Sequence, residues 1–175
     1  MAYCISNSLA GIATDCEGSL GGIKTVYLTT FQDGIFNMSG ETVTGFTTGV
    51  THFYEYQFKP ETSNFTSTLN KTAAGGSYVT TEINLVFSRM DAAKRVEMNA
   101  LALDDLAAVV ADANGKYWAF GRWLPVVSST ATGESGTAYG DANQYTVTLT
   151  ASDQNFAPEL SDGAITALKA LVSTN

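Results

Sequence analysis

The sequence has little charge, and most of what it has is negative. Charged side chains make up 15% of its 175 residues, against roughly 25% in an ordinary soluble domain. Nine basic residues stand against 17 acidic ones, which gives a formal net charge of −8. Nucleic-acid binding depends on Lys and Arg that displace counterions from phosphates. The charge balance therefore gives no electrostatic basis for tight binding of DNA or RNA. It is compatible with simple solubility, or with a surface that must not hold passing nucleic acid.

Long apolar runs are also missing. No stretch approaches the roughly 18 apolar residues of a membrane span, so we expect no membrane partner. Residues 1–22 are small, polar and glycine-studded. They have neither a positively charged N-terminal region nor a continuous apolar run, so they do not predict a secretory signal. We read them as an N-terminal arm.

Cysteine and histidine are scarce, which limits metal chemistry. Cys4, Cys16 and His52 are the only residues of these types, and they cannot complete a four-ligand zinc site without carboxylates. We predict two free thiols, with a single disulfide as the alternative. His52 alternates with Tyr and Phe along a strand pattern, which favours a partly buried, hydrogen-bonded histidine over a catalytic base.

Catalytic motifs are absent as well. The sequence contains neither Gly-x-Ser-x-Gly nor His-Glu-x-x-His. Asp104 and Asp105 are expected to end a helix, and Asp141 to close an Asx-type turn with the backbone that follows it. The Gly-rich stretches 18–22 and 133–140 precede strands, whereas a phosphate loop opens a helix. We predict no catalytic residue, no cofactor, no metal and no small-molecule substrate.

Threonine, glycine and alternating apolar residues dominate what is present, and they predict β-structure. Asn114-Gly115 between two apolar runs is a strong hairpin signal. Residues 36–49 are expected to form a short strand plus loop, and residues 128–143 a long loop. The remaining strands are predicted over Ile23–Phe31, Val50–Phe58, 64–69, Tyr78–Phe87, the two arms of the hairpin, and Gln144–Thr150.

Two segments have helical spacing. Asp91 is expected to cap a helix over about 91–104. Its apolar stripe is predicted to be Ala93, Val96, Ala100 and Leu103, widened by Leu101, while Lys94, Arg95 and Glu97 face water. A short C-terminal helix is predicted from about Ser161, with Ile165, Leu168 and Leu171 on one stripe.

Together these elements predict a mostly β fold: an antiparallel β-sandwich or barrel with one flanking α-helix and a short C-terminal helix. We expect a single domain over residues 1–175. It comprises the arm (1–22), the sandwich with its helix (23–160) and the C-terminal helix or tail (161–175).

The hairpin carries aromatic rings on both faces, at Tyr117, Trp118 and Phe120. A strand of this kind either lies inside the protein with both faces covered, or meets a partner. The two interpretations stay open on sequence alone.

Three sequence segments resemble a family of bacteriophage virion proteins, the tail tube or major tail proteins. The first joins Cys4, Cys16 and GGIKTVYL (21–28), and the second is DAAKRVEMNALA. The third is NGKYWAFGRW followed by TGESGTAYGDANQYTVTLTASDQNFAPEL. The segments occur in the same order as in that family, and the resemblance extends over most of the chain. Family members often have Gly before the aromatic at Tyr145 and Glu after that strand, where this chain has Gln144 and Ser152-Asp153.

The resemblance implies a structural virion protein and not an enzyme. Its protomers would form hexameric rings that stack into a tube with an acidic channel for DNA. The implied partners are copies of itself and other phage tail proteins, with DNA passing through without specific binding. The protein would be made in the bacterial host cytoplasm and reside in the virion.

Two alternatives remain open. One is another virion component, such as a head–tail connector ring or a capsid decoration protein. The other is a carbohydrate-binding β-sandwich, in which Trp118 and Trp123 would serve as platforms for sugar rings if they were exposed.

Overall fold

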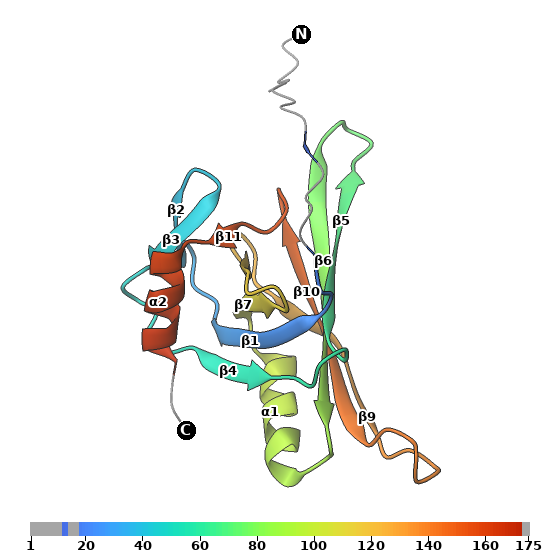
Figure 1. Ribbon diagram of the computed structural model, residues 1–175. Coiled ribbons are helices and arrows are strands. Elements are labelled where there is room, and N and C mark those ends of the chain that lie inside the picture. The colour runs from blue at the N-terminus through green and yellow to red at the C-terminus, as the bar shows by residue number, and fades with distance from the viewer. Residues whose placement is uncertain (1–11, 14–17, 173–175) are drawn as a thin grey trace.

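The computed structural model describes residues 12–13 and 18–172 (Figure 1). Cys4, Cys16 and most of the expected N-terminal arm lie outside the described residues, so the predictions about them stay predictions. Within the described part, the two helices have 12 and 10 residues, and neither is long and apolar enough to cross a membrane.

The strands form two open sheets, so the sandwich prediction is confirmed and the barrel alternative is not. The seven-stranded sheet has the order β2 (Phe36–Ser39), β3 (Thr42–Phe46), β11 (Glu159–Leu160), β8 (Tyr117–Phe120), β7 (Leu106–Asp112), β1 (Ile23–Thr30), β4 (Tyr54–Gln57). The four-stranded sheet has the order β5 (Asn64–Lys71), β6 (Ser77–Ser88), β10 (Gln144–Asp153), β9 (Val127–Glu134). All neighbouring strands are antiparallel except the short β3–β11 pair, which is parallel.

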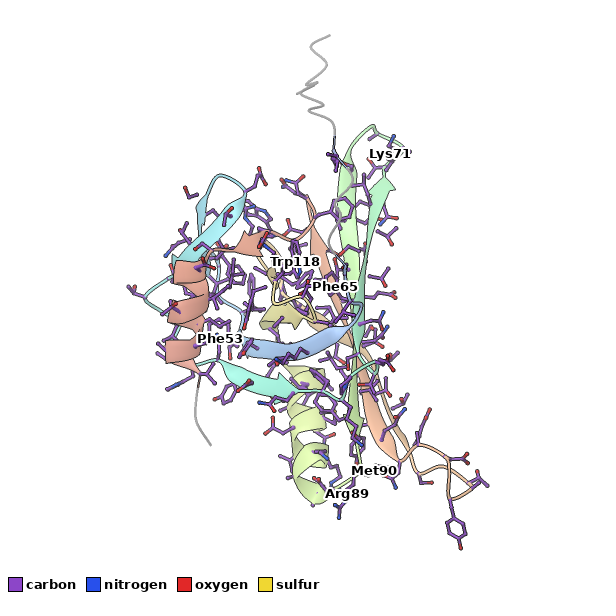
Figure 2. The ribbon with its side chains drawn as sticks, in the orientation of Figure 1. Phe53, Phe65, Lys71, Arg89, Met90 and Trp118 are labelled. Carbon is purple, nitrogen blue, oxygen red and sulfur yellow. The ribbon has the colours of Figure 1, made fainter. Side chains whose placement is uncertain are left out.

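Strand β7 is buried on both faces, which explains its continuous apolar run. Val110 belongs to the core between the two sheets, whereas Val109 belongs to a second core on the far side of the larger sheet. The aromatic hairpin is therefore internal. Tyr117 stacks on Tyr27 with ring centroids 6.2 Å apart, and Trp118 Nε1 donates a hydrogen bond to Asp112 Oδ2 at 3.2 Å. The Trp118 side chain is labelled in Figure 2.

The second core lies under α2 (Asp162–Leu171), which starts next to the predicted position; its N-cap is Ser161. Phe53 has no exposed surface (Figure 2). Its ring packs edge-on with that of Phe46, with the two ring centroids 5.0 Å apart. Its backbone N–H donates to the Leu171 carbonyl at 2.9 Å. Because Phe53 fills this core, its neighbour His52 is exposed, and the prediction of a partly buried histidine is wrong.

Helix α1 (Ala92–Leu103) begins after the predicted cap, with Asp91 Oδ1 accepting from Lys94 N at 2.8 Å. The predicted apolar stripe is confirmed only at Leu101, which is buried; Val96 is 61% and Leu103 86% exposed, and Ala93 and Ala100 are exposed as well. The Lys94 ammonium turns toward the sheet and donates to the carbonyls of Ser88 and Arg89. Met98 and Leu101, four and seven residues after Lys94, therefore face the core instead.

Two stretches contain more strand than expected: residues 36–49 were predicted to form a short strand plus loop, and residues 128–143 a loop. Residues 36–46 form the β2–β3 hairpin, and Val127–Glu134 pairs with β10 as β9. Strand β9 is exposed along most of its length. It lacks an apolar face, so its sequence gives no alternating signal, and its pairing with β10 decides its conformation.

We predict that Phe53→Ala destabilises the fold by about 3–5 kcal/mol, since it removes a fully buried ring from beneath α2. Urea unfolding monitored by circular dichroism measures this change. Tyr54→Ala is the matched control, because the neighbouring ring is 54% exposed; it should change stability by no more than about 0.5 kcal/mol. Equal losses in both variants would contradict the assigned core.

Candidate assembly interface

The four-stranded sheet buries one face and exposes the other. On β6 the predicted alternation is confirmed, with Val79, Thr81, Ile83, Leu85 and Phe87 all buried. The residues in between, and their partners in register on the other strands, form the outer face. They are Asn64, Thr66, Thr68, Asn70, Tyr78, Thr80, Glu82, Asn84, Val86, Ser88, Val127, Thr130, Thr132, Glu134, Gln144, Thr146, Thr148, Thr150 and Ser152.

Threonine dominates this outer face, and its only charges are the carboxylates of Glu82 and Glu134. Some of its polar groups bond one another across strands. Thr148 Oγ1 donates to Asn84 Oδ1 at 2.8 Å, and Asn70 Nδ2 donates to Thr80 Oγ1 at 3.2 Å. The face is therefore polar and weakly acidic, without a cation to hold an anionic ligand.

Both edges of this sheet are unpaired in the described chain. The end strands β5 and β9 each have eight residues. Each successive pair in the sheet is antiparallel, so β5 and β9 run in opposite directions. Unpaired edges of this kind present backbone N–H and C=O groups that can pair with a strand from another chain.

Beyond β9 the chain projects from the body of the molecule as a loop, residues 135–143 (Figure 1). Asp141 Oδ2 accepts from the backbone N–H groups of Thr137 and Ala138 at 2.8 and 2.7 Å. The predicted Asx-type bond thus exists but points to the preceding backbone and not to the following one. These two bonds lower the pKa of Asp141. The Tyr139 ring, at the tip, is fully exposed.

Glycine is required within this loop. Gly136 has a φ of +72°, and a Cβ there would lie 2.6 Å from Asp141 Cβ. A side chain at this position would therefore strain the backbone and displace the carboxylate that closes the loop.

The other residues singled out in the sequence do not converge on a chemical site. Asp104 caps the end of α1, and both Asp104 and Asp105 are exposed. Within the described ranges, no three residues of the His, Cys, Asp and Glu types come close enough to hold a metal ion. Trp118 is partly buried against the core, so only Trp123, 51% exposed, keeps the surface that a sugar platform would need.

A polar cavity of about 670 Å³ opens beside the start of β1. Tyr27 lies within it, and its hydroxyl donates to Glu55 Oε1 at 3.5 Å. Burial, and to a lesser degree Tyr117 and Glu55, raise the pKa of Tyr27 well above its usual value. The lining has no His, Cys or Ser among the described residues. It therefore presents no pairing of one of these nucleophiles with a histidine base.

Comparisons of the chain with models of protein families, with curated proteins and with solved structures find no match.

The sequence predicted three strands of this sheet, β5, β6 and β10, but neither β9 nor an interface on the sheet. The available signal was the run of threonines at alternate positions, as in Thr146, Thr148 and Thr150. It indicates an outer face that is polar without being charged. The free edges depend on strand order, which the pattern of a single strand does not contain.

We predict that the loop closed by Asp141 opens in acid. Because the pKa of Asp141 is lowered in the folded state, its stabilisation is complete above the ordinary Asp value of about 3.9 and is lost as the pH falls through the folded-state value. NMR titration of the Asp141 carboxyl, together with the amide shifts of Thr137 and Ala138, measures this change. Asp141→Asn keeps an acceptor oxygen, so those amides should no longer respond to pH. A midpoint at or above the ordinary value would contradict the assignment.

Proposed function

We propose that this protein is a bacteriophage tail tube subunit whose copies join edge to edge into rings. The observation that carries the proposal is the four-stranded sheet. It has two free, oppositely directed edge strands of equal length and a polar, weakly acidic outer face. This arrangement supports the resemblance to tail tube proteins, which implies the same assembly.

The joint between copies would continue the antiparallel sheet. When β9 of one copy lies along β5 of the next with full overlap, Thr132 stands opposite Thr66, and Thr130 opposite Thr68. Each of these residues points to the outer face within its own sheet. The register therefore keeps the pleat from Thr130 to Glu134, before the irregularity in the β9–β10 pairing, and Gly133 and Phe65 meet on the inner face.

The two edges are offset along the sheet, as ring closure requires. β5 pairs with β6 from Ser77 to Asn84, whereas β9 pairs with the other end of the sheet, at Gln144–Thr150 of β10. A sheet that closes into a barrel must have tilted strands and a staggered register. The offset provides this stagger without any change within the subunit.

The resulting channel has a suitable size. Four strands from each of six copies, the number the resemblance implies, make a sheet of 24 strands. With strands about 4.8 Å apart and tilted by about 40°, the barrel is about 40–50 Å across between opposite backbones. Double-stranded DNA fits inside such a barrel after its side chains are included.

The charge of the outer face suits passage of DNA. Glu82 and Glu134 repel phosphates, and the face has no Lys or Arg to hold them. Ring closure also covers edge strands that would otherwise pair without limit.

The first experiment is negative-stain electron microscopy of the concentrated protein, in which we expect rings or hollow tubes. Thr66→Lys should raise the concentration needed for assembly several-fold, because it places a long charged side chain, instead of a threonine, opposite Thr132 at every joint. Adding Thr132→Glu should restore assembly, since opposite charges on directly opposed residues attract. Adding Thr132→Lys should not.

The wild-type result decides the proposal itself. Dispersed monomers at high concentration would count against ring formation. Equal assembly by the Lys/Glu and Lys/Lys double variants would leave a ring possible but contradict the register of the joint.

We further predict that Glu82→Lys makes assembled tubes retain short DNA duplexes at low salt, with retention falling steeply as salt rises. Glu41→Lys is the matched control, since it makes the same charge change at the exposed β2–β3 turn of the other sheet. Filter retention of labelled duplex measures the effect. Equal retention by both variants would contradict the placement of the threonine-rich face toward the channel.

A further inference from the structure

An apolar groove of about 310 Å³ lies immediately before the free edge strand β5. Its floor is formed by Leu20, Gly22, Phe58, Pro60 and Ala113. Lys24 and Glu61 also line it, and both are exposed. We name it the β5 groove.

Three backbone hydrogen bonds from separate segments hold the β5 groove in shape. Ile23 N donates to the Ser63 carbonyl at 3.0 Å, and Phe58 N donates to the Lys24 carbonyl at 3.3 Å. Ala113 N donates to the Gly22 carbonyl at 3.1 Å. The groove is therefore a preformed part of the crossover from β4 to β5.

The opposite edge of the same sheet ends in the projecting loop 135–143. Asp141 N donates to the Ala138 carbonyl at 3.0 Å, which closes a four-residue turn with Tyr139 and Gly140 at its centre. The Asp141 carboxylate fixes the backbone on the other side of the turn. The most exposed aromatic ring among the described residues, that of Tyr139, is thus presented on an ordered turn.

We propose that the Tyr139 ring of one copy occupies the β5 groove of the neighbouring copy. This inference rests on the proposed ring, because it uses the joint between β9 and β5. In that antiparallel joint, the end of β9 meets the start of β5. The chain that follows Glu134 therefore runs along the neighbour's chain that precedes Asn64, which is the segment that forms the groove.

The distances along the two chains agree. Tyr139 is five residues beyond the end of β9, and Pro60 is four residues before the start of β5. At no more than about 3.6 Å per residue, the two segments reach similarly far from the joint.

The chemistry of the two surfaces is complementary as well. An aromatic ring suits a groove lined by Phe58 and Pro60, where the tyrosine hydroxyl can remain at the polar rim. Lys24 makes no ion pair with any described residue. It would meet the Asp141 carboxylate that accompanies Tyr139 into the groove.

Tyr139→Ala tests the contact directly. Because the ring is fully exposed in the single chain, the thermal unfolding of the unassembled protein should not change. The concentration needed for tube assembly should rise at least tenfold, as measured by sedimentation and electron microscopy. Tyr54→Ala, which removes a half-exposed ring from the edge of the other sheet, should assemble like wild type. Unchanged assembly by Tyr139→Ala would overturn the inference.

Cysteine cross-linking separates this inference from the proposed ring. In a Cys4→Ser, Cys16→Ser background, the pair Thr66→Cys with Thr132→Cys reports the edge joint. The pair Glu61→Cys with Tyr139→Cys reports the groove. Disulfide-linked ladders on non-reducing gels from both pairs support both proposals. Ladders from the first pair alone overturn the groove contact and leave the ring in place. Ladders from neither pair, with no tubes, overturn both.

Discussion

The fold depends on the burial of β7 from both sides. Its side chains alternate between the two cores, so this one strand joins the four-stranded sheet on one face to helix α2 on the other. A strand without a wet face has to be apolar at every position, and residues 106–111 are all buried. Once β7 is fixed in this place, its neighbours β1 and β8 are covered as well. The outer face of the four-stranded sheet then remains exposed and polar.

This division separates stability from association. The core residues of β6 and β10 hold the four-stranded sheet in place, while the opposite side chains of the same strands lie on its outer face, partly or fully exposed. The edges β5 and β9 have little apolar surface of their own. What these edges offer to another protein is their unpaired backbone N–H and C=O groups. They are therefore suited to pairing with another strand rather than to hydrophobic docking.

Much of this fold was predictable from sequence wherever burial imposes a period. The alternation in β6, the Asn114-Gly115 turn and the start of α2 near Ser161 each have a local physical cause, and each is confirmed. The failures arose where tertiary contacts decided the outcome. Helix α1 exposes Val96 because Lys94 is drawn to carbonyl groups at the end of β6, a contact that helical spacing does not encode.

The candidate interface was less predictable for a related reason. Strand β9 consists of small and hydroxyl side chains that would suit a loop equally well, and only its ladder with β10 makes it a strand. The bond between the Asp141 carboxylate and nearby backbone was predicted, but its direction along the chain was not. An Asx carboxylate can reach backbone N–H groups on either side of its own residue. Strand order, which creates the two free edges, is a property of the whole topology.

The hydrogen bonds within the threonine-rich face have a consequence for anything that moves across it. The Thr148 hydroxyl proton is already given to Asn84, and one Asn70 amide proton to Thr80. These donors are engaged within the protein, so they offer little to a passing phosphate. In the proposed channel, each such bond removes one donor from the wall along which DNA would slide. Low friction would then be a property of its internal bonding as much as of its charge.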